Sequence, residues 1–226
     1  MRRADLGREC RSLVSYAIGC IFGRYSLDKP GLQFAGGPDD GRKVPAVLPL
    51  SEETYSKDDA AEQVQQFLKD AYGEKYYAEN LRFLEAGLGK DLRSYLCNDF
   101  YADHLKIYQK RPIYWLFQSP KGSFKALIYL HRYVPGRAAD VLALCRELEA
   151  RLELSSQQSA VSGQLSKAEQ RKAEKEAEKA RTAFTEIKTW EKEVLAPLAE
   201  QRLPLDLDDG VKVNYAKFGA ALAKIK

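Results

Sequence analysis

The spacing of the apolar residues changes at Pro112, and this change constrains the fold more than any other feature of the sequence. Upstream, apolar residues recur every three or four positions, which is the period of an α-helix. Downstream, the run 113–117 alternates with the two-residue period of a β-strand, and both of its faces are apolar, so we expect it to be covered on each side. Pro120 and Gly122 then stand where a type I turn prefers them, and a second alternating run follows. The sequence therefore predicts a β-hairpin at about 113–131.

The N-terminal segment up to Gly23 has a one-sided apolar stripe, which predicts an amphipathic helix. Arg8, Glu9 and Arg11 interrupt its apolar residues, and the hydrophobic region of a secretory signal peptide would not tolerate them. We interpret this segment as a docking helix. The stretch 24–50 that follows is rich in glycine and proline, and we expect a long irregular connection with at most short extended pieces.

Helical patterning resumes after this connection. Ser56 is a plausible N-cap for a helix that Gly73 ends, and two more helices are expected over 74–89 and 90–109. The apolar positions predicted to be buried are Tyr77, Leu81, Leu84 and Leu88 on the first of these two helices, and Leu92, Leu96, Phe100 and Leu105 on the second.

Beyond Gly136 the composition shifts towards alanine, glutamate, lysine and leucine. A helix marked by apolar residues from Val141 to Leu152 precedes a polar interruption, and a long helix is predicted from about Gln164 to about Pro197. The apolar stripe of the long helix is close to a heptad repeat, so the two helices are expected to form an antiparallel, coiled-coil-like hairpin. Its alanine-rich distal half has little to bury and should project into solvent.

In the tail, a strand is predicted at Val211–Tyr215, followed by a short helix bearing Phe218, Leu222 and Ile225, and both should pack on the body of the domain. Together the elements predict a mainly α fold of the α+β class: a helical domain with a small β-hairpin and a long antiparallel helical hairpin. The expected organisation is an N-terminal docking helix and long loop over 1–50, the helical domain with its β-hairpin over 51–135, the helical hairpin over 136–201, and a C-terminal strand and short helix over 202–226.

The charge balance is a weak guide to function. The chain of 226 residues has 36 lysine and arginine residues against 32 aspartate and glutamate residues, for a formal net charge of +4. Nucleic-acid-binding proteins usually show a concentrated basic face instead of a small overall excess. Local clustering of basic residues must therefore carry any claim of DNA binding.

The cysteine spacing and the apolar runs indicate the compartment. The four cysteines lack the short Cys-x-x-Cys spacing of a zinc or redox site, so we expect them to be reduced and buried. No apolar run approaches the ~18 residues of a transmembrane helix. The sequence predicts a cytoplasmic protein without a membrane partner.

The sequence lacks the common motifs for catalysis and metal binding. There is no G-x-S-x-G elbow, no G-x-x-x-x-G-K-[ST] phosphate loop and no H-E-x-x-H pair. His104 and His131 have no partner at metal-ligand spacing, and we interpret both as structural. Asp99 and Asp103 resemble a carboxylate pair, but Lys106, three residues beyond Asp103, favours an ordinary ion pair. We predict no catalytic residue and no metal site.

The candidates for contact with a DNA backbone lie at the rim of the β-hairpin and around the long loop. Such contacts position a duplex without reading its sequence, and the alternative is scattered surface charge. Base stacking needs exposed rings, whereas the alternation at Trp115 and Phe117 favours packing in the core. The candidate residues are Lys106, Lys110, Arg111, Lys121 and Lys125 near the hairpin, and Arg24, Arg42 and Lys43 around the loop.

Four long segments together resemble one family, the PglX-type adenine-specific DNA methyltransferases of BREX phage-defence systems and related restriction-modification enzymes. The resemblance covers nearly the whole chain and lies in the C-terminal part of those proteins. The segments, in order, are LVSYAIGCIFGRYSLDKPGL, NDFYADHLKIYQKRPIYWLF, ALIYLHRY and LDLDDGVKVNYAKFG.

The resemblance implies a role in transferring a methyl group from S-adenosylmethionine to the exocyclic amine of an adenine, a base that must leave the helical stack to react. The family depends on an Asn-Pro-Pro-Tyr or Asn-Pro-Pro-Phe tetrapeptide and on a glycine-rich cofactor motif. This sequence has neither, and the NDFY segment at 98–101 lacks both prolines. S-adenosylmethionine is thus the cofactor of the full-length family, while none is expected for this chain. The resemblance therefore implies that the chain is a split-gene product, a truncated remnant or a deliberate fragment of such an enzyme.

Two functions follow as expectations. The first is a non-catalytic C-terminal module of such a methyltransferase, which scaffolds target recognition and binds double-stranded DNA weakly and non-specifically when alone. The second is a scaffold that binds the methyltransferase core or other phage-defence subunits without contacting DNA. A stand-alone enzyme is a distant third expectation.

Overall fold

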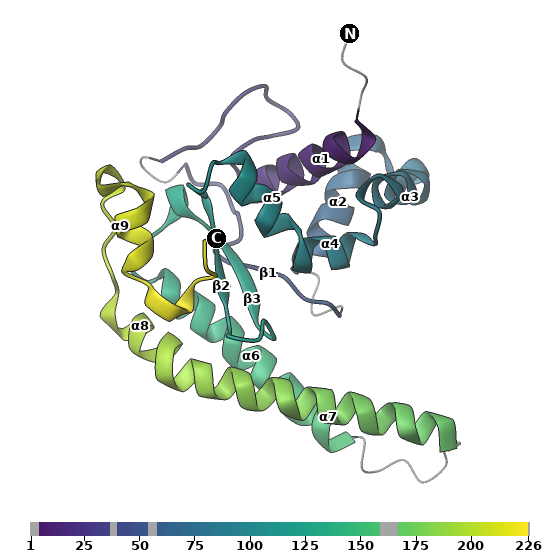
Figure 1. The fold of residues 1–226 in the computed structure, drawn as a ribbon. Coiled ribbons are helices and arrows are strands. Elements are labelled where there is room, and N and C mark those ends of the chain that lie inside the picture. Colours follow the sequence, from purple (N-terminus) through teal and green to yellow (C-terminus); the bar gives the residue numbers. More distant parts are fainter. Residues whose placement is uncertain (1–4, 37–39, 54–57, 159–166, 226) are drawn as a thin grey trace.

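A three-stranded antiparallel sheet lies at the centre of the computed structural model, between a group of helices on one face and a long helical hairpin on the other (Figure 1). The structure describes residues 5–36, 40–53, 58–158 and 167–225. The elements before the hairpin strands are α1 (Leu6–Ile21), β1 (Leu48–Pro49), α2 (Ala60–Tyr72), the 3-10 turn η1 (Glu74–Tyr76), α3 (Tyr77–Leu88), α4 (Leu92–Asn98) and α5 (Phe100–Ile107). The remaining elements are β2 (Tyr114–Gln118), β3 (Lys125–Tyr129), η2 (Leu130–Arg132), α6 (Arg137–Gln158), α7 (Lys167–Trp190), the π-helical η3 (Glu191–Leu195), α8 (Ala196–Gln201), η4 (Leu207–Asp209), α9 (Gly210–Ala216) and η5 (Gly219–Ala221). The mainly helical fold class predicted from the sequence is confirmed.

The predicted β-hairpin is present as β2 and β3. Trp115 pairs with Ile128 in an antiparallel register, and the Gly122 N–H closes the turn by donating to the Ser119 carbonyl at 2.9 Å. A third strand, β1, was not predicted. Its two residues, Leu48–Pro49, pair with β3 in an antiparallel register, so the strand order is β1-β3-β2. A proline is tolerated there because β1 is an edge strand.

The sheet is buried on both faces, as the two-sided apolar pattern predicted. Tyr114 and Leu116 point into a core formed with α1, α2, α4 and α5. Trp115 and Phe117, each 0% exposed, point into a second core formed with α6, α7, α8 and the tail. Burying one large aromatic side chain stabilises the fold by about 2–3 kcal/mol. The sheet is therefore shared by both hydrophobic cores.

The first helix packs within this chain. Its buried stripe includes Val14, Ala17 and Ile18, and α1 lies against α2 and α3. Gly87 allows the close approach to α3, because a side-chain carbon there would come within 2.3 Å of the Cys10 sulfur. The apolar face that suggested a docking helix is thus covered by the chain's own helices.

The helices before the sheet differ from the sequence prediction in three details. The single helix expected over 90–109 is two helices, because Asp99, at φ −122°, interrupts the run between α4 and α5. On α3 only Leu84 is fully buried, while the other predicted apolar positions are half-buried at its edge. Asp59 caps α2 by accepting the Glu62 N–H at 3.0 Å, whereas Ser56, the predicted cap, lies outside the described residues.

The helical hairpin formed by α6 and α7 projects from the body in Figure 1. Its buried positions on α7 include Ala177, Ile187 and Trp190, which belong to the predicted heptad-like stripe. The helical run does not stop at Pro197: it passes through the π-helical segment η3 into α8 and ends at Arg202, whose φ is +45°. Proline is compatible with the first turn of α8, where its missing N–H is not needed.

The predicted strand at Val211–Tyr215 is wrong, because this segment is the helix α9. The alternating apolar residues suggested a strand, but Val213 is 52% exposed. The buried residues are instead Asn214 and Phe218, which are four positions apart, as on one face of a helix. The Asn214 side-chain amide donates to the Gly210 carbonyl at 3.2 Å and also to the Asp206 carbonyl. The short helix expected afterwards is reduced to the single turn η5.

Candidate nucleic-acid interface

Arg24 is half-buried and fixes the start of the long loop. Its Nη1 donates to the Tyr129 hydroxyl at 2.9 Å, and its Nε donates to the Tyr25 hydroxyl at 3.2 Å. The Tyr129 hydroxyl in turn donates to the Phe34 carbonyl at 2.8 Å. Because these bonds hold the loop against β3, the guanidinium of Arg24 has a structural role.

Arg42 belongs to a second network on the same loop. It pairs with Asp40 at 2.5 Å, and Arg132 Nη2 reaches the same carboxylate at 2.8 Å. Hydrogen bonds from Arg132 and Arg42 hold the pKa of Asp40 well below its usual range. The Arg132 guanidinium also lies 3.8 Å from the centre of the Phe34 ring. Arg42 is thus paired, while the neighbouring Lys43 is exposed.

Lys106, Lys110 and Arg111 lie exposed at the C-terminal end of α5. Gln109 and Lys110 adopt positive φ values of 50° and 60°, and the Lys110 N–H donates to a carbonyl in the last turn of α5 at 2.8 Å. This left-handed turn redirects the chain from α5 towards β2. Lys106 makes the predicted ion pair with Asp103, at 3.2 Å. Lys110 and Arg111 are therefore the two exposed cations of this group without an ion pair among the described residues.

The C-terminal segment contacts α5 and β2, the elements on either side of this turn, and the sequence did not predict these contacts. The hydroxyl groups of Tyr101 on α5 and Tyr215 on α9 are 3.1 Å apart. Farther along, the Ala223 N–H donates to the Leu116 carbonyl at 2.8 Å, so the tail runs along the outer edge of β2. Three lysines of this segment are exposed, namely Lys212, Lys217 and Lys224.

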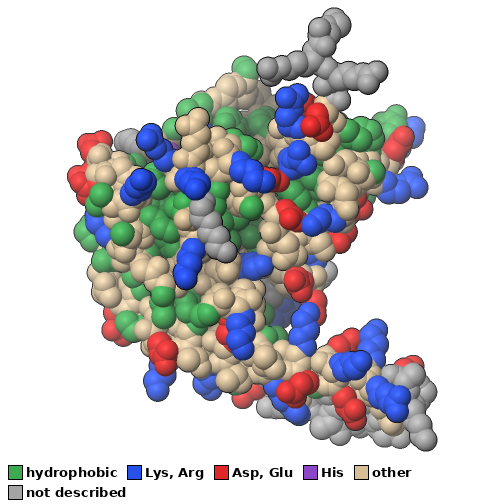
Figure 2. Space-filling view, in the orientation of Figure 1, with side chains coloured by type: hydrophobic (Ala, Val, Ile, Leu, Met, Phe, Trp, Pro, Cys, Tyr) green, Lys and Arg blue, Asp and Glu red, His purple; other side chains and the backbone are tan. Residues whose placement is uncertain are grey.

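Figure 2 views the side of the molecule on which α5, α9 and the tail meet. Lysine and arginine side chains are spread over this face, several of them around its middle. No local sequence signal places the tail here, because its pairing with β2 joins residues far apart in the chain. The structure thus adds lysines from the tail to the basic region predicted at Lys110 and Arg111.

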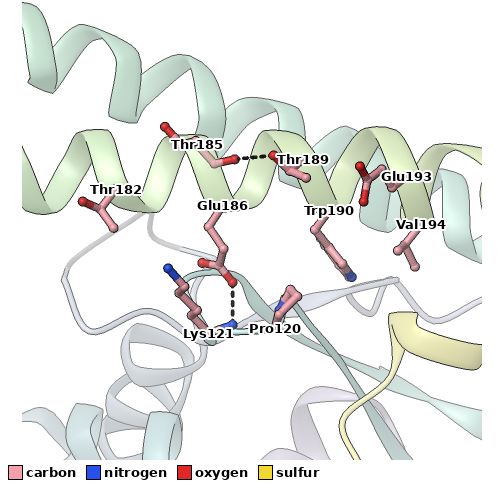
Figure 3. A pocket seen from close by; sticks show the side chains of 9 residues that line it. All are labelled: Pro120, Lys121, Thr182, Thr185, Glu186, Thr189, Trp190, Glu193 and Val194. Atoms are coloured by element: carbon pink, nitrogen blue, oxygen red, sulfur yellow. Dashed lines mark hydrogen bonds between the residues drawn. The ribbon is translucent and has the colours of Figure 1, made fainter.

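Lys121 and Lys125 lie at the other end of the hairpin. The Lys121 N–H donates to Glu186 Oε1 on α7 at 2.6 Å, which joins the turn to the helical hairpin (Figure 3). A shallow pocket of about 510 Å³ surrounds this contact and is also lined by Trp190. Lys125 Nζ donates to the Cys97 carbonyl at 2.7 Å. The two lysines are therefore separated from Lys110 and Arg111 by the length of the strands.

A larger cleft of about 980 Å³ lies between the hairpin turn, the loop after β1 and the α6–α7 arm. It opens at the lower right of Figure 2, between the body and the arm. Leu148 and Ala177 are among its apolar lining residues, and an ion pair between Lys179 and Glu52 at 3.5 Å bridges the arm to the body. Lys121 and Lys125 line this cleft instead of a continuous basic face.

The two histidines are built into the fold. Burial lowers the pKa of His104 to about 3, and its Nε2 accepts the Tyr114 N–H at 3.2 Å. The imidazole is therefore neutral at pH 7, and its Nδ1 has no hydrogen-bond partner among the described residues. Burial also lowers the pKa of His131. The His104 ring, 1% exposed, is therefore not open to a substrate in solvent, whereas the His131 ring is half-buried.

Metal and thiol chemistry find no support in the part of the chain that the structure describes. That part contains no group of three histidine, cysteine or acidic side chains arranged to hold a metal ion. All four cysteines are free, and burial raises the pKa of Cys97 to about 11, so its thiol is protonated at neutral pH. Cys20, expected to be buried, is half-buried. Within the described ranges, no helix is both long and apolar enough to span a bilayer.

Comparison with known proteins relates this chain to part of the adenine-specific methyltransferases. It is 35% identical to the adenine-specific methyltransferase BrxX of Escherichia coli O9:H4 (strain HS), over 95% of the chain and 20% of that protein. It is 39% identical to the adenine-specific methyltransferase PglX of Lacticaseibacillus casei (strain Zhang), over 96% of the chain and 20% of that protein. The chain thus spans about a fifth of the length of these relatives. No protein-family model matches it.

Proposed function

We propose that this chain is a non-catalytic module of a site-specific N6-adenine DNA methyltransferase of a BREX-type phage-defence system, corresponding to the part that follows the methyltransferase core. In this role it scaffolds target recognition and contacts the DNA backbone. The observation that carries the proposal is the similarity to adenine-specific methyltransferases, which extends over nearly the whole chain.

The sequence supports a non-catalytic role. The resemblance implies that methyl transfer needs an Asn-Pro-Pro-Tyr or Asn-Pro-Pro-Phe tetrapeptide, and the chain contains neither. Burial lowers the pKa of His104 to about 3 and raises that of Cys97 to about 11, so neither group exchanges protons readily at pH 7. Adenine chemistry and the S-adenosylmethionine site are therefore assigned to a separate part of the enzyme.

The exposed pair Lys110–Arg111 supports the contact with DNA. Both side chains are exposed to solvent at a turn with a defined backbone conformation, so two positive charges lie close together. They do not enclose a particular base. Contacts of this kind add affinity and orientation but carry no sequence information. The recognised sequence is therefore read mainly outside this chain.

The test measures binding and methyl transfer with the purified chain. Fluorescence anisotropy with a labelled DNA duplex should show weak binding whose logarithm falls linearly with the logarithm of the salt concentration. The Lys110→Gln/Arg111→Gln variant should weaken binding and reduce the salt slope by about 2. No methyl group should reach the duplex when S-adenosylmethionine is added. Methylation by this chain alone, or the absence of any salt-dependent binding, would contradict the proposal.

A second candidate function is a protein-interaction scaffold, and the cleft between the arm and the body favours it. The cleft has half-buried apolar lining residues such as Leu148 and Leu152, and a polypeptide from another defence subunit or from the methyltransferase core would cover them. The remaining four-fifths of the related BrxX protein, produced as a separate polypeptide, is the partner to test in a pull-down. Capture that Leu148→Glu abolishes and that Lys110→Gln/Arg111→Gln leaves intact would support this candidate.

A further inference from the structure

Helix α9 and the C-terminal tail, which carry exposed lysines, contact α5 and β2, the two elements joined by the turn that carries Lys110 and Arg111. We infer that Lys212 and Lys224 complete the DNA-backbone surface, so that the tail supplies a second set of phosphate contacts. This inference rests on the proposed function, and it assigns a role to a segment for which the sequence predicted only packing on the body.

The tail is held in place along β2 by backbone contacts. Leu222 forms an antiparallel bridge with Phe117, and the Ala223 N–H bonds to Leu116 at 2.8 Å. Continuing this antiparallel count places Lys224 beside Trp115, four residues from Arg111. Four residues span at most roughly 14 Å even when fully extended. With the spacing between neighbouring strands added, Lys224 lies within roughly 20 Å of Arg111 at the same edge of the sheet.

Helix α9 is held to the same place from the other side. The Tyr101 and Tyr215 hydroxyl groups meet at 3.1 Å, and the Tyr215 hydroxyl also donates to the Ala223 carbonyl. One tyrosine thus connects α5, α9 and the tail. Lys212 lies on α9 three residues before Tyr215, and its side chain is exposed. The relative positions of the cations are therefore set by buried contacts.

The acidic neighbours decide which lysines carry free charge. Lys217 pairs with Asp209 at 3.4 Å and with the Asn214 side-chain oxygen at 3.0 Å, so its charge is partly neutralised. Lys106 is neutralised in the same way by Asp103. Lys212 and Lys224, together with Lys110 and Arg111, remain as the cations that would meet phosphate groups.

The arrangement fits an extended polyanion better than a single phosphate group. The four side chains come from the turn after α5, from α9 and from the tail, and all are exposed instead of converging in a pocket. In Figure 2, basic side chains are spread over this face. A duplex presents a regular row of phosphates, and separated lysines neutralise such a row one charge at a time.

The test compares three double variants of the full chain in the same duplex titration. Lys212→Gln/Lys224→Gln should weaken affinity roughly tenfold at low salt and reduce the slope of log affinity against log salt by about 2. Lys110→Gln/Arg111→Gln reports on the proposed function itself. Lys175→Gln/Lys192→Gln removes the same charge from exposed positions on the arm and should leave the slope unchanged.

The outcomes separate the two claims. Loss of affinity in the turn variant with full affinity in the tail variant would overturn the inference and leave the proposed function standing. Equal losses in the tail and arm variants would show an effect of net charge and would also overturn the inference. If the unmodified chain binds no duplex, both claims fail. Circular dichroism checks that each variant is folded, which is expected because all the changed side chains are exposed.

Discussion

The hydroxyl groups of Tyr101 and Tyr215 lie 3.1 Å apart, although 114 residues separate them in the sequence. The Tyr215 hydroxyl donates to the Ala223 carbonyl, which leaves Tyr101 as the donor to Tyr215. Burial raises the pKa of Tyr101 to about 12, so the phenol keeps its proton at neutral pH. This short chain of hydrogen bonds connects the middle of the sequence to its C-terminal tail.

Replacing Tyr215 by phenylalanine should therefore destabilise the protein by about 1–3 kcal/mol, because Tyr101 and the Ala223 carbonyl would both lose a partner away from water. Urea denaturation followed by tryptophan fluorescence measures the change. Tyr16→Phe is a matched control, since the Tyr16 hydroxyl bonds to the Ser26 carbonyl at 3.1 Å at an exposed position, and it should cost less than about 0.5 kcal/mol. Equal costs for the two variants would contradict the role of Tyr215.

Arg132 should be the main anchor of the long loop. It donates to the Phe22 carbonyl at 3.0 Å and to Asp40, and its side chain is 11% exposed. Arg132→Met should lower the free energy of unfolding by about 1 kcal/mol, because the Phe22 carbonyl would lose its donor and the exposed Asp40 carboxylate would lose one of its two arginine partners. Limited proteolysis should then cut the loop faster. Arg42→Met, which removes the more exposed partner of Asp40, should have a much smaller effect on both measurements.

Because His104 is buried, we expect the folded protein to lose stability when the pH falls mildly below neutral. Its pKa in the folded protein is about 3, below the value of roughly 6.5 of an unfolded chain, so the unfolded state binds a proton first as the pH falls. The stabilisation is complete above pH ~6.5 and is lost as the pH falls towards ~3. Between pH ~6.5 and ~5 the loss should be about 1.5 kcal/mol.

The measurement is a set of urea denaturation curves over that pH interval. His104→Gln should be less stable at neutral pH and should show a flatter dependence on pH, because glutamine does not titrate. His131 also has a lowered pKa and contributes in the same direction, so a His131→Gln variant gives the comparison. An unchanged pH dependence in His104→Gln would rule out His104 as the cause.

Glu186 should stabilise the contact between the hairpin turn and the arm. Its Oε1 accepts the Lys121 N–H at 2.6 Å, so Glu186→Ala should cost about 1 kcal/mol, whereas Glu186→Gln keeps an acceptor and should cost less. Hydrogen exchange of the Lys121 amide reports directly on this bond. Equal exchange rates in the alanine variant and the unmodified protein would contradict the prediction.

The sequence predicted the features that depend on local patterns. The alternation around Trp115 and Phe117 predicted a strand covered on both sides, because the period of a strand alone decides which side chains share a face. The heptad-like stripe of α7 predicted its packing on α6 for the same reason. Among the basic residues, Lys106 was correctly expected to pair with Asp103.

The features that the sequence did not reveal depend on contacts between distant segments. The strand β1 has two residues, one of them Pro49, and exists because β3 pairs with it. Arg24 appeared to be a surface cation, but its contacts with Tyr129 place it inside the loop network. The lysines of the tail became part of the basic region only through the pairing of Ala223 with Leu116. Single-sequence patterns contain no information on such pairings.

The sheet that separates the two cores has a consequence for how this chain can be divided. The first four residues of β2 contribute alternately to the two cores, so a cut after the hairpin would leave Trp115 and Phe117 facing water without the helices that cover them. If the strands were removed, the N-terminal helices would likewise lose the sheet residues against which they pack. We therefore expect the elements on both sides of the sheet to unfold as one cooperative unit, and a stable fragment to need the segments on both sides of the hairpin.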